Sequence, residues 1–152
     1  MVQDSVERLM PLLNYTTSIG ADKTAAEVSK ILARAKVAST SIHYDGNGAP
    51  SGISFTLTTP HGARDFQLPV NVEGVYQILR NDRTISPRLR GRDQAVRVAW
   101  RIAKDWVEAQ VALVTAGMVK MDEVMLPYLV VGDGRKTLYA SYTERESAAL
   151  TA

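Results

Sequence analysis

The feature that most constrains the fold is the segment 88–117, in which an arginine-containing loop leads into the longest helical pattern of the chain. Asp93 is a typical N-cap residue and Gly117 typically follows a helix end, so the sequence predicts a helix between them. The remaining positions of this helix are mostly apolar and include Trp100 and Trp106, which predicts burial on several sides. Its polar positions recur every three or four residues as one narrow stripe: Gln94, Arg97, Arg101, Lys104, Asp105 and Glu108.

The chain before this helix begins with a predicted strand and a predicted helix. Residues 13–19 alternate in polarity as a strand does, and Gly20 ends that pattern. Thr24 and Glu27 have the spacing of a capping box. They precede a helical pattern with one apolar face: Val28, Ile31, Leu32 and Ala35.

Three further runs alternate in polarity and predict strands at 41–44, 53–58 and 65–70. The turns between them contain glycine and are too short for a crossover connection. They therefore predict an antiparallel meander. The resulting fold class is α+β, in which an antiparallel sheet (strand, helix, three-stranded meander) is covered by a short helix and one long, largely buried C-terminal helix.

The remaining segments are shorter. Asn71 is a suitable cap for the short helix that precedes the arginine loop of residues 80–92, and Asp122 is a suitable cap for a helical turn. Residues 128–142 fit either a hairpin or two short helices, with a preference for helices, and 144–152 read as a frayed tail. The predicted domain organisation is an N-terminal extension or short helix at 1–11, one α+β domain at 12–146 and a flexible tail at 147–152.

Positive charge is concentrated in one stretch of the chain. Between Arg80 and Arg101 there are seven arginines against Asp82 and Asp93, a local charge of +5 in a chain whose formal net charge is +2. Arginine suits bidentate recognition of phosphate or carboxylate. A helix N-terminus adds free N–H groups and a positive dipole end. The predicted ligand-binding residues are Arg88, Arg90, Arg92, Arg97 and Arg101. The alternative is a solvated loop followed by a charged helix face.

Other chemistry finds little support in the sequence. Cysteine is absent and the two histidines, His43 and His61, have no ligand spacing, so we expect surface histidines and no metal site. No nucleophile elbow or Walker-type loop occurs, and Asp105 and Glu108 fit helical ion pairs with Arg101 and Lys104 better than acid–base roles. We therefore expect a protein that is not an enzyme and needs no cofactor.

Composition also bears on location. No apolar run approaches the roughly 20 residues that span a bilayer, and the first residues do not resemble a secretory signal. The expected setting is the cytoplasm, with no membrane partner.

Two segments carry a resemblance to a known group of proteins. Residues 12–19 and 99–110 (LLNYTTSI and AWRIAKDWVEAQ) resemble a family of small proteins encoded by bacteriophages and prophages, and the similarity extends over about 12–142. The resemblance implies an accessory protein that acts in the host cell cytoplasm, where such proteins handle nucleic acids or inhibit host defence. It assigns no functional residue.

Three functions compete at this point. The first is a non-catalytic protein that binds a phosphate-containing small molecule, such as a nucleotide or a nucleotide-derived immune signal, and sequesters it to counter host defence. The second is a DNA- or RNA-binding accessory protein that uses the same arginines. The third is a protein-interaction module, or a homo-oligomer, that inhibits a host protein.

Overall fold

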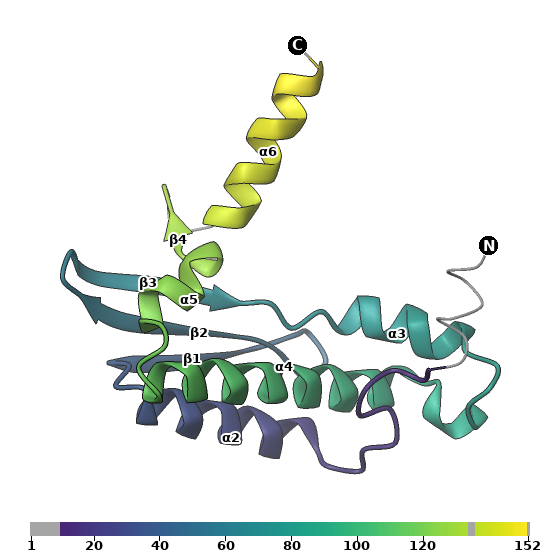
Figure 1. Ribbon diagram of the computed structural model, residues 1–152. Helices are drawn as coiled ribbons and strands as arrows, with labels where there is room; N and C mark the ends of the chain where they lie inside the picture. Colours follow the sequence, from purple (N-terminus) through teal and green to yellow (C-terminus); the bar gives the residue numbers. More distant parts are fainter. Residues whose placement is uncertain (1–9, 134–135, 152) are drawn as a thin grey trace.

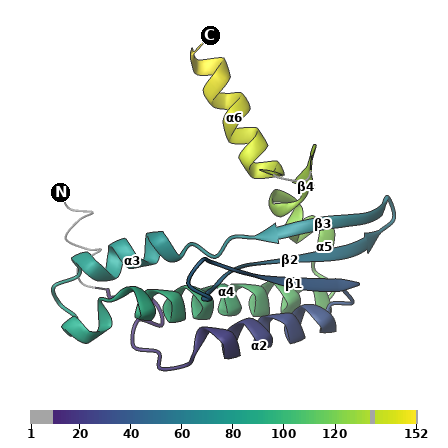
Figure 2. The same cartoon turned by 180° about the vertical axis from the view of Figure 1, so that it is seen from behind.

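A computed structural model describes residues 10–133 and 136–151 of the chain. Its centre is an antiparallel sheet in the order β1-β2-β3, formed by β1 (Ser39–Tyr44), β2 (Pro50–Thr59) and β3 (Gly62–Leu68). The helices α2 (Ala21–Arg34) and α4 (Arg92–Thr115) lie side by side against one face of this sheet (Figure 1, Figure 2). The predicted α+β class and the three-stranded meander are therefore confirmed.

The other elements lie at the two ends of this layered body. At one end, α3 (Val72–Asn81) packs on α4, and the 3-10 turn η1 (Pro87–Leu89) connects the two helices. At the other end come α5 (Met121–Met125), the turn η2 (Leu126–Tyr128), the hairpin β4 (Val130–Val131) and β5 (Lys136–Thr137), and α6 (Leu138–Thr151). In Figures 1 and 2, α6 projects away from the remainder of the molecule.

The main core lies between the sheet and the two helices. Phe55 of β2 stacks on Phe66 of β3 with ring centroids 5.2 Å apart, and both rings are buried. Trp100 is fully buried in the same core, and its indole Nε1 donates a hydrogen bond of 2.7 Å to the carbonyl oxygen of Pro50. Trp106 packs edge-on against Tyr128 at 5.4 Å. The prediction that both tryptophans belong to the core is confirmed.

The long helix begins two residues earlier than predicted, so the predicted N-cap at Asp93 is wrong, and it ends as expected. Gly91 occupies the N-cap and Asp93 lies in the first turn, where its charge still favours the helix dipole. At the other end Gly117 has φ +76°, a left-handed conformation that glycine adopts without strain. Its N–H bonds to Val114, and the N–H of Met118 bonds to Leu113, which is the Schellman pattern.

The predicted strand at 13–19 is wrong. These residues form turns and extended backbone without a strand partner, and Asn14 has φ +66°. Their polar groups bond to α4 instead of to a sheet. The side-chain nitrogen of Gln94 donates to the carbonyl oxygens of Tyr15 and Thr17 at 2.8 and 2.9 Å. Asn14 donates to Asp105 at 2.8 Å. The alternating polarity of residues 13–19 therefore belongs to an extended segment that packs on α4 and not to a strand of a sheet.

The predicted capping box at Thr24 is also wrong. Helix α2 starts one turn earlier, with Gly20 at the N-cap. Thr24 is fully buried, and its hydroxyl donates back to the carbonyl oxygen of Gly20 at 3.4 Å. The apolar face of α2 begins at Ala21, so burial of that first turn moves the helix start.

Of the two other predicted helix caps, Asn71 is confirmed and Asp122 is wrong. Asn71 caps α3, since its side-chain oxygen accepts from the N–H of Gly74 at 2.9 Å. Asp122 lies in the first turn of α5 after the N-cap Lys120, so its predicted cap role was wrong.

The C-terminal part combines a hairpin with a helix. Residues 128–142 contain the short hairpin and the start of α6, and residues 144–151, which we expected to fray, are helical. Most of the predicted extension 1–11 and Ala152 fall outside the described residues.

Candidate functional site

The arginine-rich region forms the end of the molecule where α3 meets the start of α4. A second, smaller hydrophobic core holds this end together, separate from the main core. Leu79 of α3, Ile85 and Leu89 of the connecting loop, and Ala95 and Val98 of α4 are its buried members. Because apolar residues of the loop are anchored there, the charged residues between them are directed outward. We call this region the arginine end, and define it as residues 71–93.

Arg88 and Arg90 differ in role although they are two residues apart. Arg88 is exposed on η1. Arg90 is half-buried, and its guanidinium donates to the carbonyl oxygen of Ile85 at 2.6 Å and to that of Arg83 at 3.3 Å. These bonds satisfy loop carbonyls, so Arg90 stabilises the loop rather than presenting its charge to a ligand.

Arg92 is exposed and already has two neighbours on α3. Its guanidinium pairs with Glu73 at 2.7 Å and lies 4.6 Å from the centroid of the Tyr76 ring. Hydrogen bonds from Gln77 and then from Arg92 lower the pKa of Glu73, and the bond to Glu73 raises the pKa of Arg92. The group is therefore held in one orientation at the surface, on a tyrosine face.

Arg97 and Arg101 lie further along α4, in the seam between this helix and its neighbours. The Nε of Arg97 donates to the Gln94 side chain at 3.0 Å, and Arg101 pairs with Glu27 of α2 at 2.9 Å. Both are half-buried. The predicted pair of Lys104 with Glu108 is present at 3.1 Å, whereas Arg101 bonds to α2. Most side chains of the polar stripe therefore form hydrogen bonds or ion pairs with other residues of the same chain.

The structure thus separates the five predicted arginines into two groups. Arg88, Arg90 and Arg92 lie at the arginine end, while Arg97 and Arg101 lie along the seam. Two other arginines belong with the first group: Arg80 of α3 and Arg83 of the loop are both exposed. Sequence reasoning counted them in the charge balance and left them out of the site. The signal available in the sequence was the charge of the segment, whereas the exposure of Arg80 and Arg83 depends on the tertiary structure.

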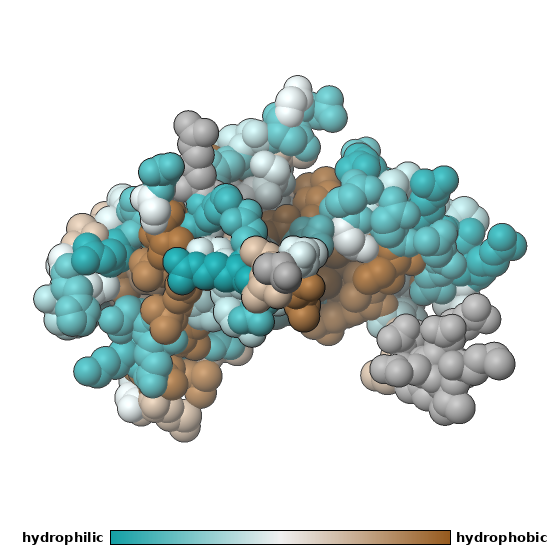
Figure 3. Space-filling view, turned by 90° about the horizontal axis from the view of Figure 1, so that it is seen from above, coloured by the Kyte–Doolittle hydropathy of each residue, from teal (hydrophilic) through white to brown (hydrophobic). Residues whose placement is uncertain are grey.

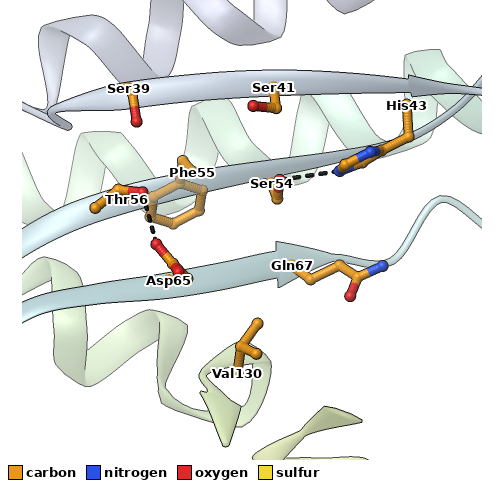
Figure 4. A pocket seen from close by; sticks show the side chains of 9 residues that line it. All are labelled: Ser39, Ser41, His43, Ser54, Phe55, Thr56, Asp65, Gln67 and Val130. Atoms are coloured by element: carbon orange, nitrogen blue, oxygen red, sulfur yellow. Dashed lines mark hydrogen bonds between the residues drawn. The ribbon is translucent and has the colours of Figure 1, made fainter. Parts of the chain in front are cut away.

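Two cavities lie away from the arginine end. The first, of about 220 Å³, lies over the open face of the sheet, and Figure 4 shows its polar side chains: Ser39, Ser41, His43, Ser54, Thr56, Asp65 and Gln67. The second, of about 670 Å³, lies between the end of β3, η2 and the first turn of α6. In the ranges that the structure describes, no arginine lines either cavity.

The open sheet face contains a serine–histidine contact that sequence reasoning missed. The Nε2 of His43 is 2.9 Å from the hydroxyl of Ser54, and Thr56 donates to Asp65 at 2.6 Å (Figure 4). A catalytic pair also needs a third group that orients the imidazole and donors for an oxyanion. Within the described part of the chain, Ser54 is the only side chain bonded to His43. We therefore interpret this contact as a cross-strand pair on an exposed face.

Residues 10–133 and 136–151 contain neither a metal-binding cluster of side chains nor a membrane-spanning helix. In these ranges no three histidine or acidic residues lie close enough together to hold a metal ion. None of the helices described there has the length and apolar character needed to cross a membrane. Comparisons of the chain with protein-family models, with curated proteins and with solved structures found no match.

Proposed function

We propose that this protein is a non-catalytic nucleic-acid-binding protein whose arginine end contacts the phosphate backbone. The observation that carries the proposal is the arrangement of four exposed arginines on three successive elements of one end: Arg80 on α3, Arg83 and Arg88 in the loop with η1, and Arg92 at the first turn of α4. Arginine side chains bind phosphates by two parallel hydrogen bonds, and the start of α4 adds its dipole to their field.

An open surface fits a polymer better than a small ligand. A nucleotide-sized molecule is held in a pocket that covers most of its surface, with a few convergent polar groups. Among the described residues, no arginine lines either of the two cavities, and the Tyr76 ring already carries Arg92 on one face. A polymer needs only successive phosphates within reach of separate side chains, which matches arginines spread over several elements.

The phage setting and a role against host defence rest on the resemblance of residues 12–19 and 99–110. They remain part of the proposal as context. Capture of a small nucleotide-like molecule is the competing outcome of the experiment below.

The experiment is fluorescence anisotropy with labelled single- and double-stranded oligonucleotides at two salt concentrations. The wild type should bind, and affinity should fall as salt rises because bound phosphates release counterions. A variant with Arg80→Ala, Arg83→Ala and Arg88→Ala should bind at least about tenfold more weakly and lose about 0.9 in the salt slope per lost phosphate contact. The control removes three exposed charges elsewhere, from α2, with Lys23→Ala, Lys30→Ala and Arg34→Ala, and should change affinity little.

These three arginines are chosen because they are exposed. Replacing Arg97 and Arg101 would instead break bonds to Gln94 and Glu27, so a loss of binding there would be confounded by a change in the fold. Equal losses in the arginine and control variants would reduce the effect to net charge and overturn the proposal. So would absence of oligonucleotide binding at low salt together with titratable binding of mono-, di- or cyclic nucleotides.

A further inference from the structure

Helix α6 is the least supported element of the described chain. It has 14 residues, none of them buried, and extends for about 21 Å at the rise of an α-helix. Its neighbours are the short segments before it, η2, β4 and β5, and Figures 1 and 2 show the rest of the helix standing free. A helix of this length is marginal in water unless tertiary contacts support it. It therefore needs a surface to pack against.

The outward side of α6 has the composition of a contact surface. Tyr139 and Tyr142 lie with ring centroids 6.2 Å apart and are both exposed, as are Leu138 and Leu150. Seen from above, the face from which α6 rises shows hydrophobic side chains among polar ones (Figure 3). The positions Tyr142, Arg145, Glu146 and Ala149 follow the spacing of three and four residues that places side chains on one helix face.

We propose that α6 packs antiparallel against α6 of a second copy of this chain, about a two-fold axis that passes between Arg145 and Glu146. In that register Arg145 faces the partner's Glu146, and Glu146 faces the partner's Arg145. Tyr142 lies against the partner's Ala149, so a large side chain meets a small one on both sides of the axis. A two-fold contact requires this self-complementarity of one surface patch.

The second cavity fits the same register. It lies at the base of α6 and is lined largely by apolar and aromatic residues: Leu68, Pro69, Pro127, Tyr128, Tyr139 and Ala140. In the antiparallel pair the partner's Leu150 comes level with Ser141, next to Tyr139 and Ala140 in this lining. Leu150 is the most exposed large hydrophobic residue in the described chain, at 87%. Each copy thus offers both an exposed leucine and an apolar hollow to receive it.

The long helix α4 is not the dimer surface in this proposal. Its sides are covered by α2, α3 and the sheet of its own chain. A pair of short helices with two seated leucines is smaller than a standard interface of about 800 Å² per partner, so we expect dissociation in the micromolar range, about 1–100 μM.

The experiment is sedimentation equilibrium of the full chain over a concentration series that brackets this range. The wild type should shift from monomer to dimer. Arg145→Glu should raise the dissociation constant about tenfold or more, because it places like charges opposite each other twice. The swapped variant Arg145→Glu/Glu146→Arg should restore dimerisation, because the charges face each other again in reversed order. Leu150→Ser should weaken the dimer without affecting the charge pair.

Ser147→Glu is the matched control, since position 147 lies about 140° around α6 from position 142 and so lies off the proposed contact face. It should dimerise like the wild type, and far-UV circular dichroism should show an unchanged fold for every variant. A wild type that stays monomeric throughout overturns the proposal. A dimer that is insensitive to Arg145→Glu, or a swapped variant that remains monomeric, overturns it as well.

Discussion

The two halves of α4 belong to two different cores. The half that starts at Trp100 packs into the main core with α2, the sheet and α5, and the buried apolar side chains of this core come from five elements: α2, β2, β3, α4 and α5. The half that precedes it packs into the second core with α3 and the η1 loop, whose buried members are fewer and smaller. One helix thus joins a rigid body to a small end whose role is to hold charged residues in place. We expect the main core to determine global stability and the second core to determine the order of the arginine end.

The largest effect on stability is expected for Trp100→Ala, which tests the main core. The side chain is fully buried and bonds to Pro50, so its removal leaves a large cavity and an unpaired carbonyl. We expect a loss of about 3–5 kcal/mol in the free energy of unfolding, measured by urea denaturation. The control Met118→Ala removes a 70% exposed side chain and should change stability by less than about 0.5 kcal/mol. A loss below about 1 kcal/mol for Trp100→Ala would contradict the main-core assignment.

Leu79→Ala tests the second core. Leu79 is 1% exposed, and we expect a loss of about 2–3 kcal/mol. Native-state hydrogen exchange should show faster exchange at residues 82–91 than in β2, because the loop is anchored in this core and β2 in the main core. Ile78→Ala, the neighbouring exposed position on the same helix, is the control. If exchange accelerates equally in the loop and in β2, the two cores form one cooperative unit.

Gln94→Ala tests the hydrogen bonds that α4 makes at the boundary between its two halves. This buried glutamine donates to Tyr15 and Thr17 and accepts from Arg97. Its loss leaves two carbonyls without their donor, and we expect about 1–2 kcal/mol of destabilisation, with exchange accelerating at residues 12–19. The control is Gln110→Ala, sixteen residues further along α4. Unchanged protection of 12–19 would show that the segment is held by other contacts.

The smallest expected effect concerns Glu73, whose pKa is lowered from its usual 4.5. A lowered folded-state pKa means that the carboxylate stabilises the fold fully above 4.5, and that this contribution disappears as the pH falls through the lowered value. Glu73 and Arg92 are both exposed, so the contribution is small and screened by salt. NMR titration should show that Gln77→Ala and Arg92→Ala each return the pKa of Glu73 toward 4.5, because hydrogen bonds from both side chains lower it. A pKa of Glu73 that neither substitution moves would contradict this assignment.

Local sequence patterns predicted most of the elements correctly, because each of those patterns was compatible with only one type of secondary structure. The alternation at residues 53–58 lies within β2, and that predicted at 65–70 lies within β3 as far as Leu68, since a strand with one buried face must alternate. Gly117 ended the long helix because a left-handed position favours glycine. Residues 13–19 also alternate, yet Gln94 binds their carbonyl oxygens and Asp105 binds the Asn14 side chain, and no local pattern specifies partners 77 to 91 residues away.

The candidate site shows the same division. The charge of the segment 80–101 could be read directly, because arginine is charged in any fold. Whether a given arginine faces solvent or contacts a neighbouring residue could not be read from the sequence. Arg90 turns onto loop carbonyls and Arg101 onto Glu27, while Arg80, Arg83 and Arg88 are exposed. Each of these outcomes depends on which backbone or carboxylate oxygens the packing brings near.

The sequence by itself determined the α+β class, the meander and the long central helix, because polarity period, turn residues and helix-end glycine act locally. Only the tertiary structure decided that this helix contributes to two cores and that most of its polar stripe bonds to other residues of the chain. It also decided that α6 has no buried residue. These depend on contacts between residues distant along the chain, whose free energy is set by mutual packing and by the pairing of buried polar groups.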